Sequence, residues 1–466
     1  MFICRFTHDL RLEDHAALAA AAEAGPVLPI LVLDAELDQS LRRSPRRAAF
    51  FVAAVCALDA SLRERGSRLV MRRGDAAEVL TRIARECGAT GVAWSARYDG
   101  AGMQLDETLR AQLEEAGLQA RLVHDAPAIA PEEIERSDDG MGYRAFQAYF
   151  ERRRALPIPS FDRPLLMRFA SAEIESDPLP QPSDFGSNAA LPEASSSVAA
   201  AALEQFLSSS ALLYATAQHV PAEDGTSHLS PHFSFGTISM RVAVRATLQR
   251  IDDPFLLNEE RHSLRLFLRS LALRDFFLQL AWFHPETQQM ALQERMRDFE
   301  FAQTHPALDA WCEGKTGYPL VDAGMRQLAQ TGWMHPHVRA VAASFLCFDL
   351  GVDWRVGRDA WDRLLVEDDP AVATGNWQWI AGVGADLAQY PRIYNPETQA
   401  RRFDPEARYI RRWLPELEHA PLATWQRKRE ETPMLPLFDG SAYPARVVDH
   451  GAAARAFLAR YRERVS

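Results

Sequence analysis

The sequence predicts an N-terminal α/β domain with a parallel, Rossmann-like sheet, followed by a larger all-helical domain. Over residues 1–125, short apolar runs alternate with amphipathic helical patterns. After residue 201, apolar residues recur at helical spacing with few strand signals. Strands that alternate with helices form a parallel sheet that is covered on both faces. These two patterns set the predicted architecture.

The elements of the α/β domain follow in order along the chain. We expect strands at residues 3–6, 26–34, 68–73, 90–95 and 120–125, and helices at residues 12–25, 44–66, 75–87 and 104–117. The loop after the first strand, THDLRLED, lacks a GxGxxG sequence, so a standard dinucleotide-binding site is not predicted there. In the helical part, long helical patterns cover residues 257–283 and 337–350.

The predicted domains are residues 1–125 and 201–466, and a connector joins them. Residues 126–200 are rich in proline and serine and show no sustained periodicity. Such a composition is typical of an interdomain linker.

Composition limits the class of protein. The chain has 466 residues and no run of about 18 apolar residues, so a membrane span is not expected. The N-terminus has no apolar signal-peptide region. Five scattered cysteines without a CxxC pair argue against a disulfide framework, a zinc site or an iron–sulfur cluster. We therefore expect a cytoplasmic protein with no metal centre.

The net charge of −11 gives no general attraction to nucleic acid. Four arginines near the C-terminus form either a local basic groove for DNA or a solvated face. They are Arg401, Arg402, Arg411 and Arg412.

Two groups of polar residues interrupt the helical part. In GTSHLSPHFSFGTIS (225–239), Thr226, Ser227 and Ser230 offer hydroxyls at what the pattern predicts to be a helix start. Such a start either is a simple N-cap or binds phosphate. In residues 267–285, Arg274 and Asp275 interrupt an apolar helix, as a buried ion pair or a ligand contact would.

A third group lies between residues 311 and 395. Arg339 is on a predicted helix with an otherwise apolar face, and a buried arginine needs an acidic partner. The acids available are Glu367, Asp368 and Asp369. Trp354 and Trp377 flank them, either as core residues or facing a polar cofactor.

These segments resemble the signatures of the photolyase/cryptochrome family, in particular a class I-like bacterial member. TSHLSPHFSFGTIS is similar to the family's TSRLSPYLAFGxIS. GKTGYPLVDAGMRQL, TGWMHPHVR, DWR, GNWQW and YPRIYNPETQ are close to other family signatures in the same order and spacing. The resemblance covers nearly the whole chain, and it implies a helical domain that holds FAD.

The resemblance also implies roles for single residues. Arg274 approaches the cofactor, Arg339 pairs with Glu367 beside the isoalloxazine, and Trp377 and Trp354 are the proximal and middle tryptophans of an electron-transfer chain. The family normally has aspartate at the position of Glu367. The implied cofactor-binding residues are Tyr214, Thr226, Ser227, His228, Leu229, Ser230, Arg274, Arg339, Glu367, Asp368 and Asp369.

The chain departs from the family where a pyrimidine dimer is held. Ser270 and Leu273 stand where repairing members have a glutamate and a stacking tryptophan, and Pro336 stands where they have asparagine. Ala373 takes the position that faces flavin N5, and Phe301 takes that of the outer tryptophan. Trp361 or Trp311 are the alternatives for that outer role.

We therefore expect a FAD-binding, blue-light-responsive photoreceptor or light-driven redox protein with impaired or altered dimer repair. One alternative is a DNA photolyase with an altered substrate mode, acting on single-stranded DNA or another lesion. Another is a structural or partner-binding protein that has lost the flavin. The segment SARYDGAG (95–102) resembles the antenna segment of the family only loosely, so a second folate or deazaflavin chromophore is allowed but unsupported. The sequence does not identify a signalling partner.

Overall fold

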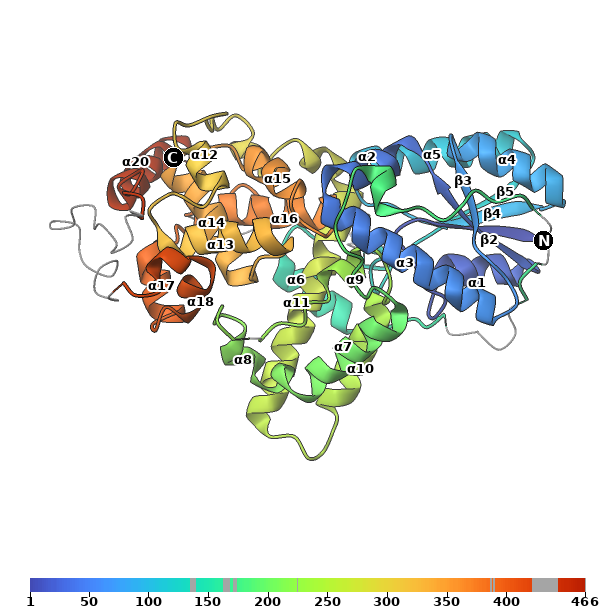
Figure 1. Ribbon diagram of the computed structural model, residues 1–466, viewed down its shortest axis with the longest axis horizontal. Helices are drawn as coiled ribbons and strands as arrows, with labels where there is room; N and C mark the ends of the chain where they lie inside the picture. The colour runs from blue at the N-terminus through green and yellow to red at the C-terminus, as the bar shows by residue number, and fades with distance from the viewer. Residues whose placement is uncertain are drawn as a thin grey trace. The chain divides into compact units, whose positions relative to one another are not determined.

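A computed structural model describes residues 1–134, 140–161, 168–170, 174–223, 225–385, 388, 390–420 and 443–465 (Figure 1). Residues 135–139, 162–167 and 171–173 of the predicted linker lie outside the described residues. The chain forms two compact units. The first holds Met1–Leu212, Ser227–Gln288 and Val366–Val372, and the second holds Leu213–Thr226, Gln289–Leu365 and Ala373–Ser466. The predicted domain limits at residues 125 and 200 stay a prediction.

The first unit is built on a five-stranded parallel sheet of order β3-β2-β1-β4-β5. The strands are β1 (Phe2–Phe6), β2 (Val27–Leu33), β3 (Val70–Arg73), β4 (Gly91–Ser95) and β5 (Gln119–Val123). In register, Phe2 lies opposite Val27 and Ile3 opposite Val92. Every residue of β1 and β2 is buried, as the continuous apolar runs require of a sheet covered on both sides. All five predicted strands are confirmed.

Helices cover both faces of this sheet, as Figure 1 shows. Alternate residues of β1 and β2 pack with α1 (Ala16–Glu23) and α3 (Pro45–Glu64) on one face, and with α4 (Ala76–Cys87) and α5 (Gly100–Glu115) on the other. The sequence analysis missed α2 (Ala35–Arg43), a nine-residue helix that buries only Leu37 and Leu41. Asp34 caps it by accepting from the Leu37 N–H at 2.9 Å.

Further helices belong to the first unit. The longest is α11 (Asn258–Phe283), which covers the predicted segment 257–283. Asp275 of α11 accepts from Arg153 of α6 at 2.7 Å, and both side chains are buried. The other elements are η1 (Pro131–Ile134), α6 (Phe146–Arg154), η3 (Pro182–Phe185), α7 (Ser196–Ser208), η4 (Ser210–Leu213), α9 (Ser230–Ser234), α10 (Met240–Ile251) and η5 (Pro285–Gln288).

The second unit is helical around one apolar core, which includes Trp311, Phe345 and Trp354. Its predicted helix at 337–350 is α14 (Pro336–Ser344), continued by a π-turn, η7 (Phe345–Asp349). The other elements are α8 (Tyr214–Ala217), η6 (Glu294–Met296), α12 (Leu308–Cys312), α13 (Pro319–Thr331), α15 (Trp354–Asp362), α16 (Pro370–Ala381), α17 (Pro396–Phe403), α18 (Arg408–Trp413), η8 (Pro415–Leu417) and α20 (His450–Val465).

Among the described residues no single helix has both the length and the apolarity that a membrane span requires. One bent pair, Ser196–Ser208 with Ser210–Ala217, passes on length and composition.

Candidate functional site

Glu367 lies in the short segment 366–372 of the first unit, and two elements of that unit hold it. Its Oε1 accepts from Ser230 Oγ at 2.6 Å, and its backbone carbonyl accepts from Arg47 Nη2 at 2.8 Å. The Glu367 side chain is buried. The hydroxyl segment and the acidic segment, 137 residues apart in the chain, therefore meet at a charge-assisted hydrogen bond.

Asp368 points toward the α/β part of the first unit. His8 Nε2 lies 3.1 Å from its Oδ2, Ser40 Oγ donates to the same oxygen, and Arg47 Nη1 lies 3.7 Å from Oδ1. Burial opposes ionisation of this carboxyl, but Arg47 and His8 outweigh it and lower the Asp368 pKa well below its usual range. Both oxygens are thus engaged by protein groups. The prediction that Asp368 binds the cofactor stays a prediction.

Arg274 and Asp369 form an ion pair within the first unit. The Arg274 guanidinium also lies 5.8 Å from the ring centre of Phe233. Burial raises the pKa of Asp369, and the charge of Arg274 acts against that rise. Of the two charged residues predicted to interrupt α11, Arg274 therefore pairs with Asp369, while Asp275 pairs with Arg153.

The hydroxyl segment has features that suit a phosphate-bearing cofactor. Helix α9 begins at Ser230, close to the predicted helix start, and His228 just before it has a left-handed backbone with φ of 51°. Ser227 Oγ accepts from the Leu229 N–H at 3.4 Å. Thr226 Oγ1 is buried and has no hydrogen-bond partner among the described residues. A buried hydroxyl in that state is costly unless a ligand pairs with it, so the segment fits the FAD that the resemblance implies.

Ser270, Leu273 and Arg274 follow one another on a partly exposed face of α11, at the i, i+3 and i+4 spacing of one helix side. The Ser270 hydroxyl donates to the Phe267 carbonyl at 2.7 Å within the helix. Leu273 presents an apolar side chain beside Arg274. This face carries no carboxylate and no aromatic ring at those positions.

Pro336 is the first residue of α14, where its fixed φ favours helix initiation and its missing N–H costs nothing. His335 caps the helix, since its Nδ1 accepts from the His337 N–H at 3.2 Å. Arg339, on the same helix, donates from Nε to the Met334 carbonyl at 2.8 Å. Its predicted partner Glu367 belongs to the other unit, so that pairing stays a prediction. Ala373 lies in the first turns of α16.

The second unit contains a buried cluster of tryptophans. The ring of Trp377 lies 4.5 Å from that of Trp361 and 6.5 Å from that of Trp311, measured between centroids. Trp354 is buried, with the Arg355 and Arg358 guanidiniums 5.0 and 5.3 Å from its ring centre. Phe301, which the resemblance assigns to the outer position, packs on Phe299.

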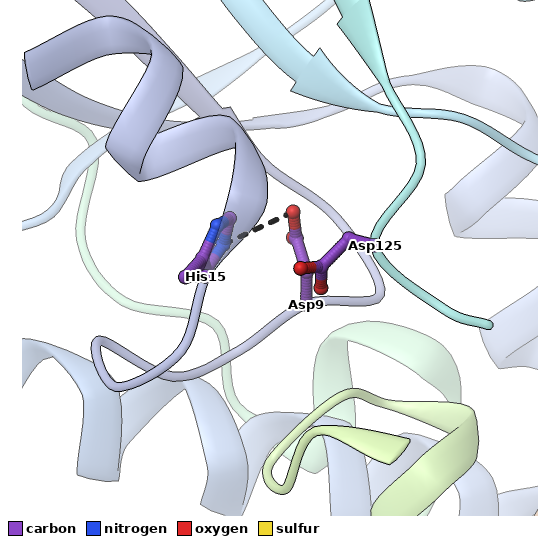
Figure 2. A group of neighbouring side chains, drawn as sticks. All are labelled: Asp9, His15 and Asp125. Carbon is purple, nitrogen blue, oxygen red and sulfur yellow. Dashed lines mark ion pairs between the residues drawn. The ribbon is translucent and has the colours of Figure 1, made fainter. Parts of the chain in front are cut away.

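One polar group of the first unit was missed by sequence reasoning (Figure 2). Ligand atoms of Asp9, His15 and Asp125 lie within 4.8 Å of one another, a spacing that a metal site could have. However, His15 Nδ1 accepts from the Leu18 N–H at 3.1 Å and Nε2 lies 3.1 Å from Asp9 Oδ2, so both ring nitrogens face protein groups.

Asp125 in this group is held by two arginines. Arg11 and Arg241 donate to it at 2.7 Å each, and burial is outweighed by their charges, which lower the Asp125 pKa. This group is an ionic network that fixes the loop after β1 to α10. Its members lie between Asp9 and Arg241 in the sequence, so no local motif predicts the network.

A cavity of about 520 Å³ lies at the carboxyl ends of β2 and β3 in the first unit. That volume is within the range of small-molecule sites. Charged residues of its lining pair with one another, Arg5 with Asp34 and Arg97 with Glu36. The sequence analysis did not assign a second chromophore to these residues.

The fold and the hydroxyl segment fit a FAD-binding flavoprotein, and the family matches identify one. Residues 267–463 match the sequence family described as "FAD binding domain of DNA photolyase", and residues 2–165 match "DNA photolyase". The chain belongs to the photolyase/cryptochrome family.

Relatives with different names are about equally similar. The deoxyribodipyrimidine photo-lyase of Halobacterium salinarum is 34% identical over 95% of each chain. Cryptochrome-1 of Arabidopsis thaliana is 33% identical over 95% of this chain and 67% of its own length. A bacterial class III photolyase structure from Agrobacterium tumefaciens superimposes with a TM-score of 0.84 at 30% identity, covering 99% of this chain and 97% of that one. Both the predicted family and the predicted fold are confirmed.

Proposed function

We propose that this protein is a blue-light photoreceptor or light-driven redox protein in which repair of pyrimidine dimers is impaired. Bound FAD supplies light absorption and one-electron acceptance. Thr226, Ser227 and Ser230 would hold its phosphates and ribityl chain, and Arg274 with Asp369 would lie near its ring system. Trp377 would be the residue that gives up an electron.

One observation carries the proposal, namely the partly exposed face of α11 around Arg274. Ser270 uses its hydroxyl inside the helix, and Leu273 offers no π face to a base. Stacking of a base on an aromatic side chain is worth roughly 1–3 kcal/mol, so its loss weakens capture of a flipped dimer by roughly 5- to 150-fold. Pro336 adds a further loss, because it has no side-chain amide.

A second candidate function is a DNA photolyase that acts on single-stranded DNA or another lesion. Two features favour it, the photolyase names of the relatives and the exposed arginines near the C-terminus. Arg402 and Arg412 are exposed, with guanidiniums 4.9 and 5.4 Å from the rings of Phe403 and Trp413. Such a cation beside a π face suits a single strand.

Two measurements on the purified protein test these proposals. Denaturation should release about one flavin per chain, and a colourless protein would favour the third alternative, a protein that has lost its flavin. Under blue light with a reductant, a thymine-dimer oligonucleotide should be repaired far more slowly than by a repairing photolyase run in parallel. Repair at that enzyme's efficiency would overturn the photoreceptor proposal. Salt-dependent preference for damaged DNA would favour the second candidate.

We also propose a cytoplasmic location. All five cysteines are free, and disulfides are the rule in oxidising compartments.

A further inference from the structure

The loop that joins α10 to α11 carries the most exposed large apolar side chain of the described residues. Phe255 is 92% exposed and Leu257 is 64% exposed, while Leu256 between them is buried. Leu248, in the last turn of α10, is also exposed. Helices α10 and α11 lie side by side, and the loop is at their common end (Figure 1). We call Leu248, Phe255 and Leu257 the apolar tip of the first unit.

An arginine holds the backbone of this loop. Arg261 of α11 donates from Nε to the Ile251 carbonyl at 3.2 Å and from Nη1 to the Leu256 carbonyl at 2.8 Å. Its Nη2 donates to the Asp253 carbonyl between them. One guanidinium therefore ties the start, the middle and the end of the loop to the beginning of α11, and each of these hydrogen bonds has a charged donor.

Two acids fix the N–H groups on either side of the buried Leu256. Asp253 Oδ1 accepts from the Phe255 N–H at 2.9 Å, and Glu260 Oε2 accepts from the Leu257 N–H at 2.7 Å. The second contact joins a glutamate in the first turn of α11 to the N-cap residue, as in a capping box. The loop backbone is thus ordered before a partner binds. An ordered loop loses little conformational entropy when its apolar side chains become buried.

The charge around the apolar tip is negative. Residues 250–261 contain four acids and two arginines. Both arginines are engaged within the loop, because Arg250 pairs with Asp253 and the other holds the loop carbonyls. Asp252 and Glu259 are exposed, and no ion pair of either is present among the described residues. Two uncompensated carboxylates therefore flank the apolar side chains.

This negative charge distinguishes between the occupants that an exposed apolar surface attracts. A second copy of the chain would bring the same acids to the contact. Anionic lipid and DNA present negative phosphates, and like charges oppose these contacts as well. A basic partner is attracted instead, and apolar side chains buried at the centre of the contact then supply most of the affinity. An amphipathic helix combines both features on one face.

We propose that the apolar tip docks a basic amphipathic helix of a partner protein. Apolar side chains of that helix cover Phe255 and Leu257, and its lysines or arginines lie against Asp252 and Glu259. The contact uses neither flavin nor light, so the inference does not rest on the proposed function, and its failure leaves that function untouched.

Fluorescence anisotropy with a labelled probe peptide tests the proposal on the purified full chain. The probe is an amphipathic leucine–lysine helix of about 18 residues, or about five turns. A peptide of the same composition in scrambled order keeps the charge but lacks the apolar face. We expect the probe to bind at micromolar concentration and the scrambled peptide to bind at least about tenfold more weakly. Failure of the probe to bind, or equal binding of the two peptides, would overturn the proposal.

Substitutions in the tip locate the contact. Phe255→Ser should weaken probe binding at least about tenfold, because a buried aromatic residue is a typical hot spot of an interface. Leu257→Ser should weaken it less, and it decides the question if Phe255→Ser has a lowered melting temperature. Leu191→Ser is the matched control, since Leu191 is 51% exposed in the first unit but lies outside the tip. Unchanged binding in both tip variants would contradict the proposal.

A pair of neutralising variants tests the part of the acids. Asp252→Asn with Glu259→Gln should weaken probe binding about threefold or more at low salt, and added salt should reduce the difference. The control is Glu114→Gln with Glu115→Gln, which removes two exposed charges from α5 and changes the net charge equally. An equal loss in both pairs would assign the attraction to net charge and overturn the proposal.

Two further measurements identify a wrong occupant. Sedimentation of the unaltered protein should show no dimer that Phe255→Ser abolishes, and vesicles of phosphatidylglycerol should bind the unaltered protein and Phe255→Ser equally weakly. A dimer or a vesicle contact that depends on Phe255 would overturn the proposal in favour of self-association or of a lipid surface.

Discussion

The residues that we propose to face the cofactor differ in their contacts from those at the proposed substrate positions. In the first unit, Ser230 binds Glu367 at 2.6 Å and Arg274 pairs with Asp369, so polar groups there are held in place by one another. At the positions where relatives of the family bind a dimer, Ser270 hydrogen-bonds its own helix and Leu273 is apolar. Under the proposed function, the first set suits light-driven electron uptake, and the second set lacks the carboxylate and the aromatic ring that dimer capture would use.

Restoring a carboxylate and an aromatic ring on the α11 face should have the largest effect. The double variant Ser270→Glu, Leu273→Trp adds a carboxylate and a stacking ring on one helix side. We expect affinity for dimer-containing DNA to rise roughly 5- to 150-fold, the range given by 1–3 kcal/mol of base stacking. Binding to damaged and undamaged oligonucleotides and repair per absorbed photon are the measurements.

Leu266→Trp is the matched control for this variant. Leu266 is also partly exposed on α11, but it lies about two turns from Leu273. It should add a tryptophan without raising the affinity for damaged DNA. If the double variant keeps its flavin and gains nothing, these two positions are not what limits dimer capture.

Ser230→Ala tests the hydrogen bond between Ser230 and Glu367, two of the proposed FAD-binding residues. The change leaves the buried Glu367 carboxylate without its 2.6 Å donor, which costs about 1–3 kcal/mol. We expect a lower melting temperature and a lower flavin-to-protein ratio after purification. Ser227→Ala is the control for the melting temperature alone, because Ser227 is also a proposed FAD contact but its Oγ accepts a long 3.4 Å bond from the Leu229 N–H. If both variants lower the melting temperature equally, the Ser230–Glu367 hydrogen bond does not stabilise the fold more than that long bond does.

Gly357→Ala separates packing around Trp377 from flavin binding. The added methyl would meet Trp377 at 2.3 Å and Leu346 at 2.4 Å, and overpacking of a buried site costs typically about 1–3 kcal/mol. Helix propensity alone predicts the opposite sign, a gain of about 1 kcal/mol. Chemical denaturation of the variant decides between the two. If the variant has a higher free energy of unfolding, the Trp377 ring shifts to make room for the added methyl group.

The order and spacing of the signatures were enough to predict the family and FAD, and the alternation of strand and helix patterns predicted the parallel sheet. Sequence reasoning did not predict which group each charged side chain meets. Asp368 was assigned to the cofactor, yet its contacts come from His8, Ser40 and Arg47, more than 300 residues away. The ring contact of Trp361 with Trp377, at 4.5 Å between centroids, exists only because the fold brings α16 against α15. Long-range partners of this kind leave no local pattern.

The smallest expected effect is that of replacing Asp368, whose carboxylate contacts His8, Ser40 and Arg47. The folded state lowers its pKa, so its ionised form stabilises the fold above about pH 4, the ordinary aspartate value. That contribution is lost as the pH falls through the lowered pKa, because the unfolded chain then binds the proton first. Asp368→Asn should therefore reduce the free energy of unfolding at pH 7, and the difference from the unaltered protein should shrink in acid. Denaturant titrations at pH 7, 5 and 3 measure this, and a difference that grows toward acid would contradict the structural role of Asp368.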